Sequence, residues 1–339
     1  MYIARMNKLR YGDLATNDKA LLAHTGLTSE EFERLCPFFE AAWQRYIRAY
    51  TFEGKPRQRE SRKQRANAVF ATPEDRLLFV LYYLKTNPLQ EVLASAFGLR
   101  QPHASFWLKL LLPRLEEALG KAQALPERKS ERLYRAVEGH SCVLIDGTER
   151  PVGRSTDYET QKEYYSGKKK RHTIKNVLIA TPEKRILYMS ETYEGTVHDK
   201  RIADEEALDF GTMTSGTMTS GTTSGTTSGF GTFGKEIPEQ VRTLLQDLGF
   251  QGYAPEGVSV VQPKKKPRGT SLTPEQKAAN RAISRKRVVV EHAIGGVKVW
   301  RIVKEQIRSW LHAIRDQVMY LACGLHNFRL ACRGAPIQP

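Results

Sequence analysis

The apolar residues of this chain change their spacing once, near residues 121–138, and this change constrains the fold more than any other feature. Upstream, they recur every three or four positions, as in helices buried on one face. An example begins at Thr28, which with Glu31 forms a capping box before Phe32, Leu35 and Trp43. Downstream, short β-branched and aliphatic runs alternate with helical segments, which is typical of a mixed sheet. We therefore expect a helical region over residues 1–125 and an α+β or mixed α/β region over residues 138–333.

Residues 72–119 have the outline of a helix-turn-helix. Thr72 and Pro73 open one helix, Asn87-Pro88 ends it, and a short second helix ends at Gly98 before a longer third. The third helix would present four polar residues at its N-terminal end, where such helices touch base edges. These are Arg100, Gln101, His103 and Ser105. A simple three-helix bundle with no DNA contact has a similar outline.

The charge of the chain favours a polyanionic partner. Lys and Arg total 53 against 37 Asp and Glu, a net charge of +16, and such a surface attracts nucleic acid or an anionic membrane. No window of about 18 consecutive apolar residues is present, which argues against a membrane span. The N-terminus lacks an apolar signal core, and the four cysteines form no CxxC pair. We expect a cytoplasmic protein that binds DNA.

Residues 211–234 are a short tandem repeat of Gly, Thr and Ser. Such a segment buries too little apolar surface to offset its ordering entropy, so we expect a flexible loop.

Three carboxylates stand at positions that suit a catalytic site. Asp146 follows the apolar run 142–145, and Asp247 ends another apolar run before a Gly-bearing turn. Glu291 lies in a long helix that begins at Thr273. Simpler interpretations are turn aspartates and a glutamate paired with Arg287 one helical turn earlier. In a strongly basic chain, three such acids suggest a divalent-metal site that acts on phosphate esters, because Mg²⁺ prefers oxygen ligands.

The chain resembles DDE-superfamily transposases of bacterial insertion sequences, in the insertion sequence 5 group, akin to the PIF/Harbinger branch. The resemblance rests on motifs that occur in the family's order over residues 140–300 and on the helix-turn-helix region. The motifs are IDGTERP (145–151), QKEYYSGKKKRHTIKN (161–176), GTVHDK (195–200), DLGFQGY (247–253) and the segment 280–298 with Glu291. The Gly/Thr/Ser repeat departs from the pattern, because the family connects Asp199 to the next strand more briefly.

The resemblance implies an RNase H-like catalytic domain that uses two Mg²⁺ or Mn²⁺ ions. It implies cleavage at transposon ends and strand transfer by the freed 3′ hydroxyl. Carried over by motif, Asp146 is the first catalytic acid and Glu291 the third. Asp247 is the favoured second acid, and Asp199 in the motif GTVHDK is the alternative. If Asp247 is the ligand, we expect Asp199 to cap the helix that begins near it or to order the site from behind.

The basic runs become candidate contacts to DNA phosphates, with solvated surface charge as the simpler interpretation. They comprise Lys168, Lys169, Lys170, Arg171 and Lys175, then Lys264, Lys265 and Lys266, and finally Arg285 and Lys298. The expected partners are transposon-end and target DNA, bound by a homodimer or larger assembly. A repressor-like DNA-binding derivative without catalysis, and a nuclease that cuts without strand transfer, are the two competing functions.

Overall fold

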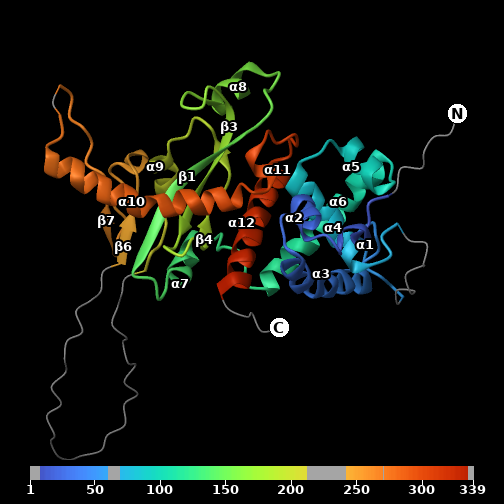
Figure 1. Cartoon of the computed structure of the whole chain (residues 1–339). Helices are drawn as coiled ribbons and strands as arrows, with labels where there is room; N and C mark the ends of the chain where they lie inside the picture. The colour runs from blue at the N-terminus through green and yellow to red at the C-terminus, as the bar shows by residue number, and fades with distance from the viewer. Residues whose placement is uncertain (1–7, 60–68, 212–241, 270, 335–339) are drawn as a thin grey trace, which may run out of the picture.

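The computed structural model describes residues 8–59, 69–211, 242–269 and 271–334, and places a helical region beside a mixed sheet (Figure 1). Most of the Gly/Thr/Ser repeat, residues 212–234, lies outside the described residues. The expected fold class, an N-terminal helical helix-turn-helix region followed by a mixed α/β domain, is confirmed. No helix within the described ranges is both long and apolar enough to cross a membrane.

The first helices pack by the face that the sequence predicts. The described part of the chain begins with three helices, α1 (Tyr11–Leu14), α2 (Asp18–Thr25) and α3 (Ser29–Ala49). The predicted capping box is present: Thr28 Oγ1 accepts a hydrogen bond from the Glu31 amide at 3.2 Å, and Glu31 Oε2 accepts from the Thr28 amide at 3.0 Å. Phe32, Leu35 and Trp43 are all buried, so this face of α3 forms part of the core.

Three helices form the predicted helix-turn-helix: α4 (Pro73–Thr86), α5 (Gln90–Phe97) and α6 (Gln101–Lys121). The turns between them rely on left-handed residues. Asn87 has φ 47° after α4, and Gly98 has φ 68° after α5. Glycine suits the second turn because it has no Cβ to oppose this conformation.

The sheet lies in the second half of the chain, and its main path runs β2-β3-β1-β6-β7. These strands are β1 (Cys142–Pro151), β2 (Tyr165–Ser166), β3 (Arg171–Ala180), β6 (Arg242–Leu245) and β7 (Val258–Val261). Two further strands, β4 (Ile186–Met189) and β5 (Tyr193–Glu194), pair with β3. Strand β1 is antiparallel to β3 but parallel to β6, and β6 is parallel to β7. Because β1, β6 and β7 run in the same direction, residues that follow them can meet at one edge of the sheet.

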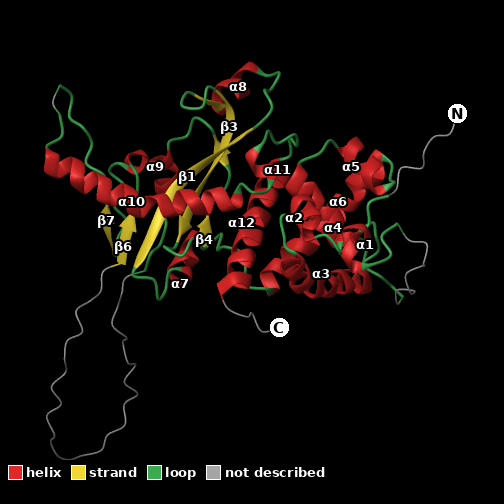
Figure 2. Cartoon of the chain, viewed as in Figure 1, coloured by secondary structure: helices red, strands yellow, loops and turns green. Residues whose placement is uncertain are grey.

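Helices cover both faces of the sheet (Figure 2). One face packs on α10 (Pro274–Val297) and α12 (His312–Gly334), through a core that includes Leu144, Leu245 and Val290. The other packs on α7 (Leu133–Ala136) and α9 (Asp199–Glu205), through a second core that includes Val143 and Ile202. Successive residues of β1 therefore face different helices, as strand geometry requires.

The two regions share one core. The larger core cluster runs from α3 and α6 through α12 to the sheet, and α12 lies between the helical region and the sheet in Figure 1. The final helix packs on the sheet and also contacts α6, where Gln317 Nε2 donates to Glu116 Oε2 at 2.9 Å. The short segments α8 (Tyr158–Tyr164) and α11 (Arg301–Lys304) complete the described helices beside the 3-10 turns Ser130–Arg132 and Leu248–Phe250.

Candidate active site and DNA-binding surface

Asp146 lies in the middle of β1. The sequence suggested that the strand ends at Ile145, and this was wrong, because β1 continues to Pro151. The polar residues after Asp146 pair with β3 in regular register, from Asp146 opposite Leu178 to Pro151 opposite Thr173. The carboxylate reaches the sheet edge for another reason: the parallel neighbour β6 stops at Leu245.

Asp247 holds the equivalent place beside β6. Leu144 of β1 lies opposite Leu245 of β6, so Asp146 and Asp247 each follow this pair by two positions. Asp247 leaves the strand and begins the 3-10 turn Leu248–Phe250, where its Oδ1 accepts a hydrogen bond from the Gly249 amide at 2.8 Å. Parallel register therefore sets the two aspartates side by side.

Both aspartates face α10. Leu144 belongs to the core on the α10 side, and Asp146, two positions later in the same strand, shares its face. Asp247 lies beyond the end of β6 and is placed by a side-chain contact. Arg287 of α10 provides independent support, because its guanidinium lies 4.0 Å from Asp247 Oδ2. The expected pairing of Arg287 with Glu291 is replaced by this contact across to the sheet edge.

Glu291 follows Arg287 by four positions and precedes Lys298 by seven, so the three share one face of α10. Lys298 Nζ donates to the Glu149 carbonyl of β1 at 3.2 Å. Glu291 therefore lies between Arg287 and Lys298 on one face of α10, and both of these residues reach across to the sheet. The surroundings of Glu291 are mixed, because Val290 is buried but Glu291 itself is exposed.

The electrostatics of Asp146 are those of a crowded anionic site. Its pKa is raised to about 6, first by burial and then by the neighbouring carboxylate of Asp247, with a smaller contribution from Asp199. Arg287 and the Gly147 amide act in the opposite sense. Oxygen donors that repel one another suit a hard divalent cation, which would relieve the repulsion. Within the described ranges, no three His, Cys, Asp or Glu side chains already stand in a metal-binding cluster.

Asp199 approaches from the opposite face of β1. A Cβ built on Gly147 would lie 2.7 Å from the Asp199 carboxylate, so the carboxylate fills the space that glycine leaves. Of the two roles expected of Asp199, capping α9 is wrong, because His198 holds the N-cap position and Asp199 is the first helical residue; the role of ordering the site from behind stays a prediction. Its Oδ1 instead lies 3.4 Å from Lys175 Nζ.

Lys175 was grouped with the DNA-contacting lysines, and this was wrong because its side chain is buried. Nζ donates to the Val197 carbonyl at 2.8 Å and lies 3.7 Å from Glu149 Oε1. The alternation of β3 carries a signal for this, since Lys175 shares its face with the buried Val177. Lys175 is buried and Glu149 is partly buried. Both lie in the quoted motifs, but the sequence did not indicate that they support the site from within.

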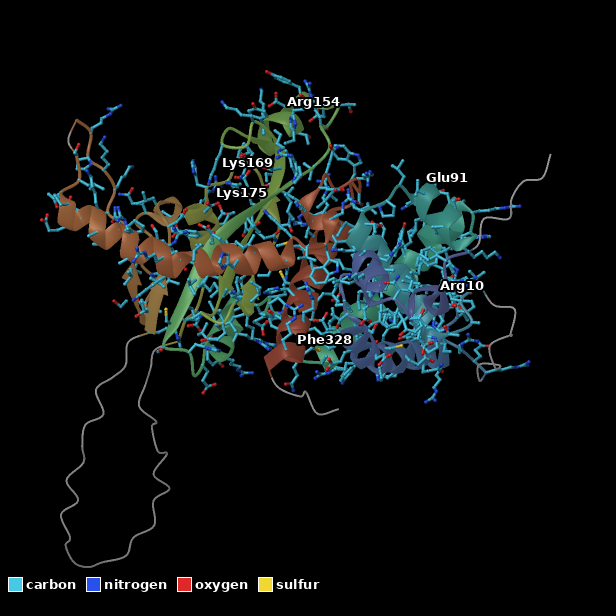
Figure 3. The ribbon with its side chains drawn as sticks, viewed as in Figure 1. Arg10, Glu91, Arg154, Lys169, Lys175 and Phe328 are labelled. Atoms are coloured by element: carbon cyan, nitrogen blue, oxygen red, sulfur yellow. The ribbon has the colours of Figure 1, made fainter. Side chains whose placement is uncertain are left out.

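The remaining basic candidates lie on the surface. Lys168, Lys169, Lys170 and Arg171 are exposed beside β3, and Lys264, Lys265, Lys266 and Arg285 are exposed beside α10. Figure 3 shows Lys169 and Lys175 along the same part of the ribbon below Arg154. Asn280 of α10 holds the loop at Lys264, exchanging hydrogen bonds of 2.7 and 2.9 Å with its backbone. Lys298 is half-buried, and burial lowers its pKa.

The N-terminal end of α6 offers a mixed surface. Arg100 and His103 are exposed, whereas Gln101 and Ser105 are half-buried. Gln101 Nε2 donates to Gln90 Oε1 of α5 at 2.5 Å, so one of the four predicted base-reading side chains also holds α5 and α6 together.

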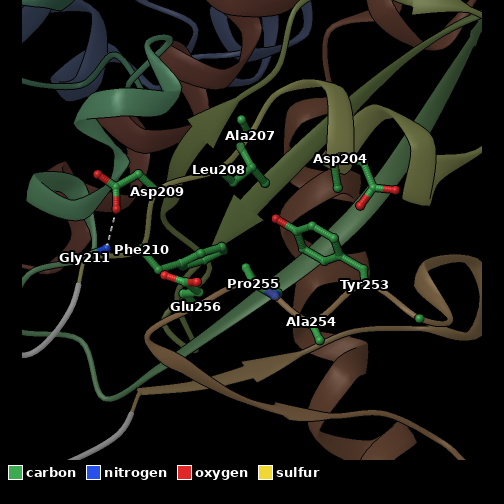
Figure 4. A pocket seen from close by; sticks show the side chains of 12 residues that line it. Asp204, Ala207, Leu208, Asp209, Phe210, Gly211, Tyr253, Ala254, Pro255 and Glu256 are labelled. Carbon is green, nitrogen blue, oxygen red and sulfur yellow. Dashed lines mark hydrogen bonds between the residues drawn. The ribbon is translucent and has the colours of Figure 1, made fainter.

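A cavity of about 500 Å³ lies at the other end of α9 from Asp199 (Figure 4). Asp204, Asp209 and Glu256 give it an acidic lining, and the buried Tyr253 hydroxyl has no hydrogen-bond partner among the described residues. None of the predicted site residues lines this cavity.

Comparison with known proteins supports both regions. Residues 145–327 match the family model of the DDE superfamily endonuclease, and residues 72–121 match the helix-turn-helix of DDE superfamily endonuclease. The probable transposase for insertion sequence element IS702 of Microchaete diplosiphon is 23% identical over 307 residues, which cover 91% of this chain and 97% of that protein. No solved structure matches significantly. The endonuclease match spans more than half of the chain, which therefore belongs to the DDE superfamily of endonucleases.

Proposed function

We propose that this endonuclease is a DNA transposase of an insertion sequence, with Asp146, Asp247 and Glu291 as its catalytic acids. The observation that carries the proposal is the β1–β6 register, which sets Asp146 and Asp247 side by side facing α10. The name of the Microchaete diplosiphon relative, a probable transposase, supports transposition over simple cleavage.

Family membership implies a divalent metal in general, and the residues present fit one. The three acids would hold Mg²⁺ or Mn²⁺, and we propose a pair of ions. When bound, such ions lower the pKa of water and stabilise charge on the phosphate being cut. The chain's own contribution is to set Asp146 and Asp247 at one sheet edge, with Arg287 beside Asp247. In the proposal, Glu291 of the neighbouring α10 completes the site, and Arg287 and Lys298 serve as cations for DNA phosphates.

Asp247 is a better second acid than Asp199. Asp146 and Asp247 share the α10 face, whereas Asp199 reaches the site from the α9 face, through the gap at Gly147. The charge of Asp199 is already partnered by the buried Lys175. We therefore assign Asp199 a supporting role, in which it fixes β1 from behind.

DNA would be bound at two places. The exposed end of α6, with Arg100 and His103, would read the transposon end. The exposed basic residues beside β3 and α10 would grip phosphates around the acids, and this electrostatic term would give a strong salt dependence. A dimer or larger assembly on the two ends, working at the bacterial nucleoid, completes the proposal.

The test begins with the DNA that flanks the gene, where inverted terminal repeats would supply the substrate. Asp146→Asn should abolish Mg²⁺-dependent cleavage of that DNA while binding stays within about twofold, because removing one charge leaves the basic surface intact. Full cleavage by Asp146→Asn would refute the proposal.

Two further comparisons refine the test. Asp247→Ala should lose all turnover, whereas Asp199→Ala should retain some. Products joined to target DNA, rather than merely cut, distinguish a transposase from a nuclease without strand transfer. A wild-type protein that binds the ends but never cuts them, even with Mn²⁺, would favour the repressor-like alternative.

A further inference from the structure

The loop before α12 carries an exposed apolar tip that the proposed chemistry does not use. The side chains of Trp310 and Leu311 are 56% and 65% exposed. Trp43 and Trp300 are buried and Trp107 is half-buried, so Trp310 carries the most exposed indole among the described residues. A single exposed leucine needs no explanation, but an indole beside a leucine on a fixed loop does.

Three separate elements hold this loop in place. The Ile307 amide donates to the Pro151 carbonyl at the end of β1 at 3.0 Å. Arg308 Nη1 donates to the Asn87 carbonyl at the end of α4 at 2.6 Å, and Arg315 Nε of α12 donates to the Ser309 carbonyl at 2.7 Å. A side chain held in this way loses little conformational entropy when it binds a ligand.

The indole is itself packed and has a cation beside it. A Cβ on Gly153 would lie 3.2 Å from Trp310 Cζ2, so the ring rests against the glycine. The Arg315 guanidinium lies 5.1 Å from the Trp310 ring centroid. Arg308 and Arg154 are further cations close by in the chain, the first two positions before Trp310 and the second next to Gly153. An aromatic ring in a basic neighbourhood is complementary to a nucleotide, whose base stacks while its phosphate is attracted to the cations.

The position of the loop also fits DNA. It joins Asn87, within the helix-turn-helix, to Pro151, at the end of the strand that carries Asp146. Five residues of strand separate Asp146 from Pro151, which is about 17 Å at the usual strand rise. A DNA strand covers that distance in about five nucleotides. One DNA molecule bound at both places would pass beside Trp310.

We propose that Trp310 is a stacking platform for an unpaired base of the DNA that lies between the helix-turn-helix and the acidic edge. The inference rests on the proposed function, because it takes the DNA path from it. An unpaired base is required because the faces of paired bases are already stacked on their neighbours. Stacking on an aromatic side chain strengthens binding by about 5- to 100-fold for each base and tolerates any sequence.

The experiment measures binding of the full chain to two fluorescent DNA probes without divalent metal. One probe is a fully paired duplex, and the other has the same sequence on one strand and a short central bubble of mismatches. The wild type should prefer the bubble. Trp310→Ala should weaken bubble binding about tenfold or more and leave duplex binding within about twofold. Trp310→Phe, which keeps an aromatic face, should retain most of the preference, and Leu311→Ala is the matched control that should keep all of it.

Equal affinity of wild type and Trp310→Ala for the bubble would overturn the inference, as would an equal loss on both probes. A Trp310→Ala protein that changes from oligomer to monomer in sedimentation would also overturn it, because the tip would then be a self-association surface. The inference and the proposed function fail separately: bubble preference needs no catalysis and should persist in Asp146→Asn, whereas cleavage lost in Asp146→Asn says nothing about Trp310.

Discussion

Replacing Gly147 by alanine should disturb the site from behind without touching any proposed metal ligand. The new Cβ would lie 2.7 Å from the Asp199 carboxylate, about 0.7 Å closer than ordinary contact at 3.4 Å. Asp199 cannot simply swing away, because the buried Lys175 holds it and it begins α9. Overpacking of this kind costs about 1–3 kcal/mol of stability. A shift of β1 approaching 1 Å would also misplace Asp146, and such displacements lower rates by up to about 100-fold.

The assay combines urea unfolding with metal-dependent cleavage of end DNA. The matched control is Gly167→Ala, because Gly167 is exposed, has no atom within 4 Å of its added Cβ and lies outside the left-handed region. The control should keep wild-type stability and rate. If Gly147→Ala matched the control in both, Asp199 would not be packed against β1 and the supporting role assigned to it would be wrong.

Two further predictions follow from the same geometry. Burial and neighbouring carboxylates raise the pKa of Asp146 to about 6, so the acid is protonated below that pH and cannot bind metal. Cleavage should therefore fall as the pH drops through about 6, and the midpoint of this fall should move to lower pH as the Mn²⁺ concentration is increased. A cleavage rate that does not change with pH in this range would refute the assignment. In α10, the Cβ added by Gly295→Ala would meet open space, so this variant should stabilise the fold by about 0.5–1 kcal/mol. The Cβ added by Gly296→Ala would collide with the buried His326 ring, so this variant should destabilise the fold by about 1–3 kcal/mol. Urea midpoints that move in the same direction for both variants would contradict this packing.

The elements that could be predicted from the sequence depend on local chemistry. The capping box at Thr28 and the helix start at Thr273 were expected and are present, because a cap involves only residues three positions apart. The full length of β1 could not be predicted, since the polar residues after Asp146 look like a turn. Arg150 is buried there because it donates to Asn176 Oδ1 at 2.6 Å and to the Arg315 carbonyl at 2.8 Å, contacts that are distant in sequence.

The sequence nominated the candidate acids but not their geometry. The family resemblance points to Asp146, Asp247 and Glu291, whereas the side from which each approaches depends on strand register and on which face packs against α10. The ion pair of Lys175 with Asp199 was missed because the alternation of residues along β3 is only a weak sign that a charged side chain is buried. Both gaps concern contacts between segments far apart along the chain.

The most direct test of the account is metal specificity after a change of ligand. Asp146→Cys and Asp247→Cys replace a hard oxygen ligand by a thiolate, which prefers softer metals than Mg²⁺. We predict that each variant is inactive on end DNA with Mg²⁺ and regains cleavage with Mn²⁺, while the wild type cuts with both. Cleavage by either variant at the wild-type rate with Mg²⁺ would contradict the claim that these two side chains hold the metal.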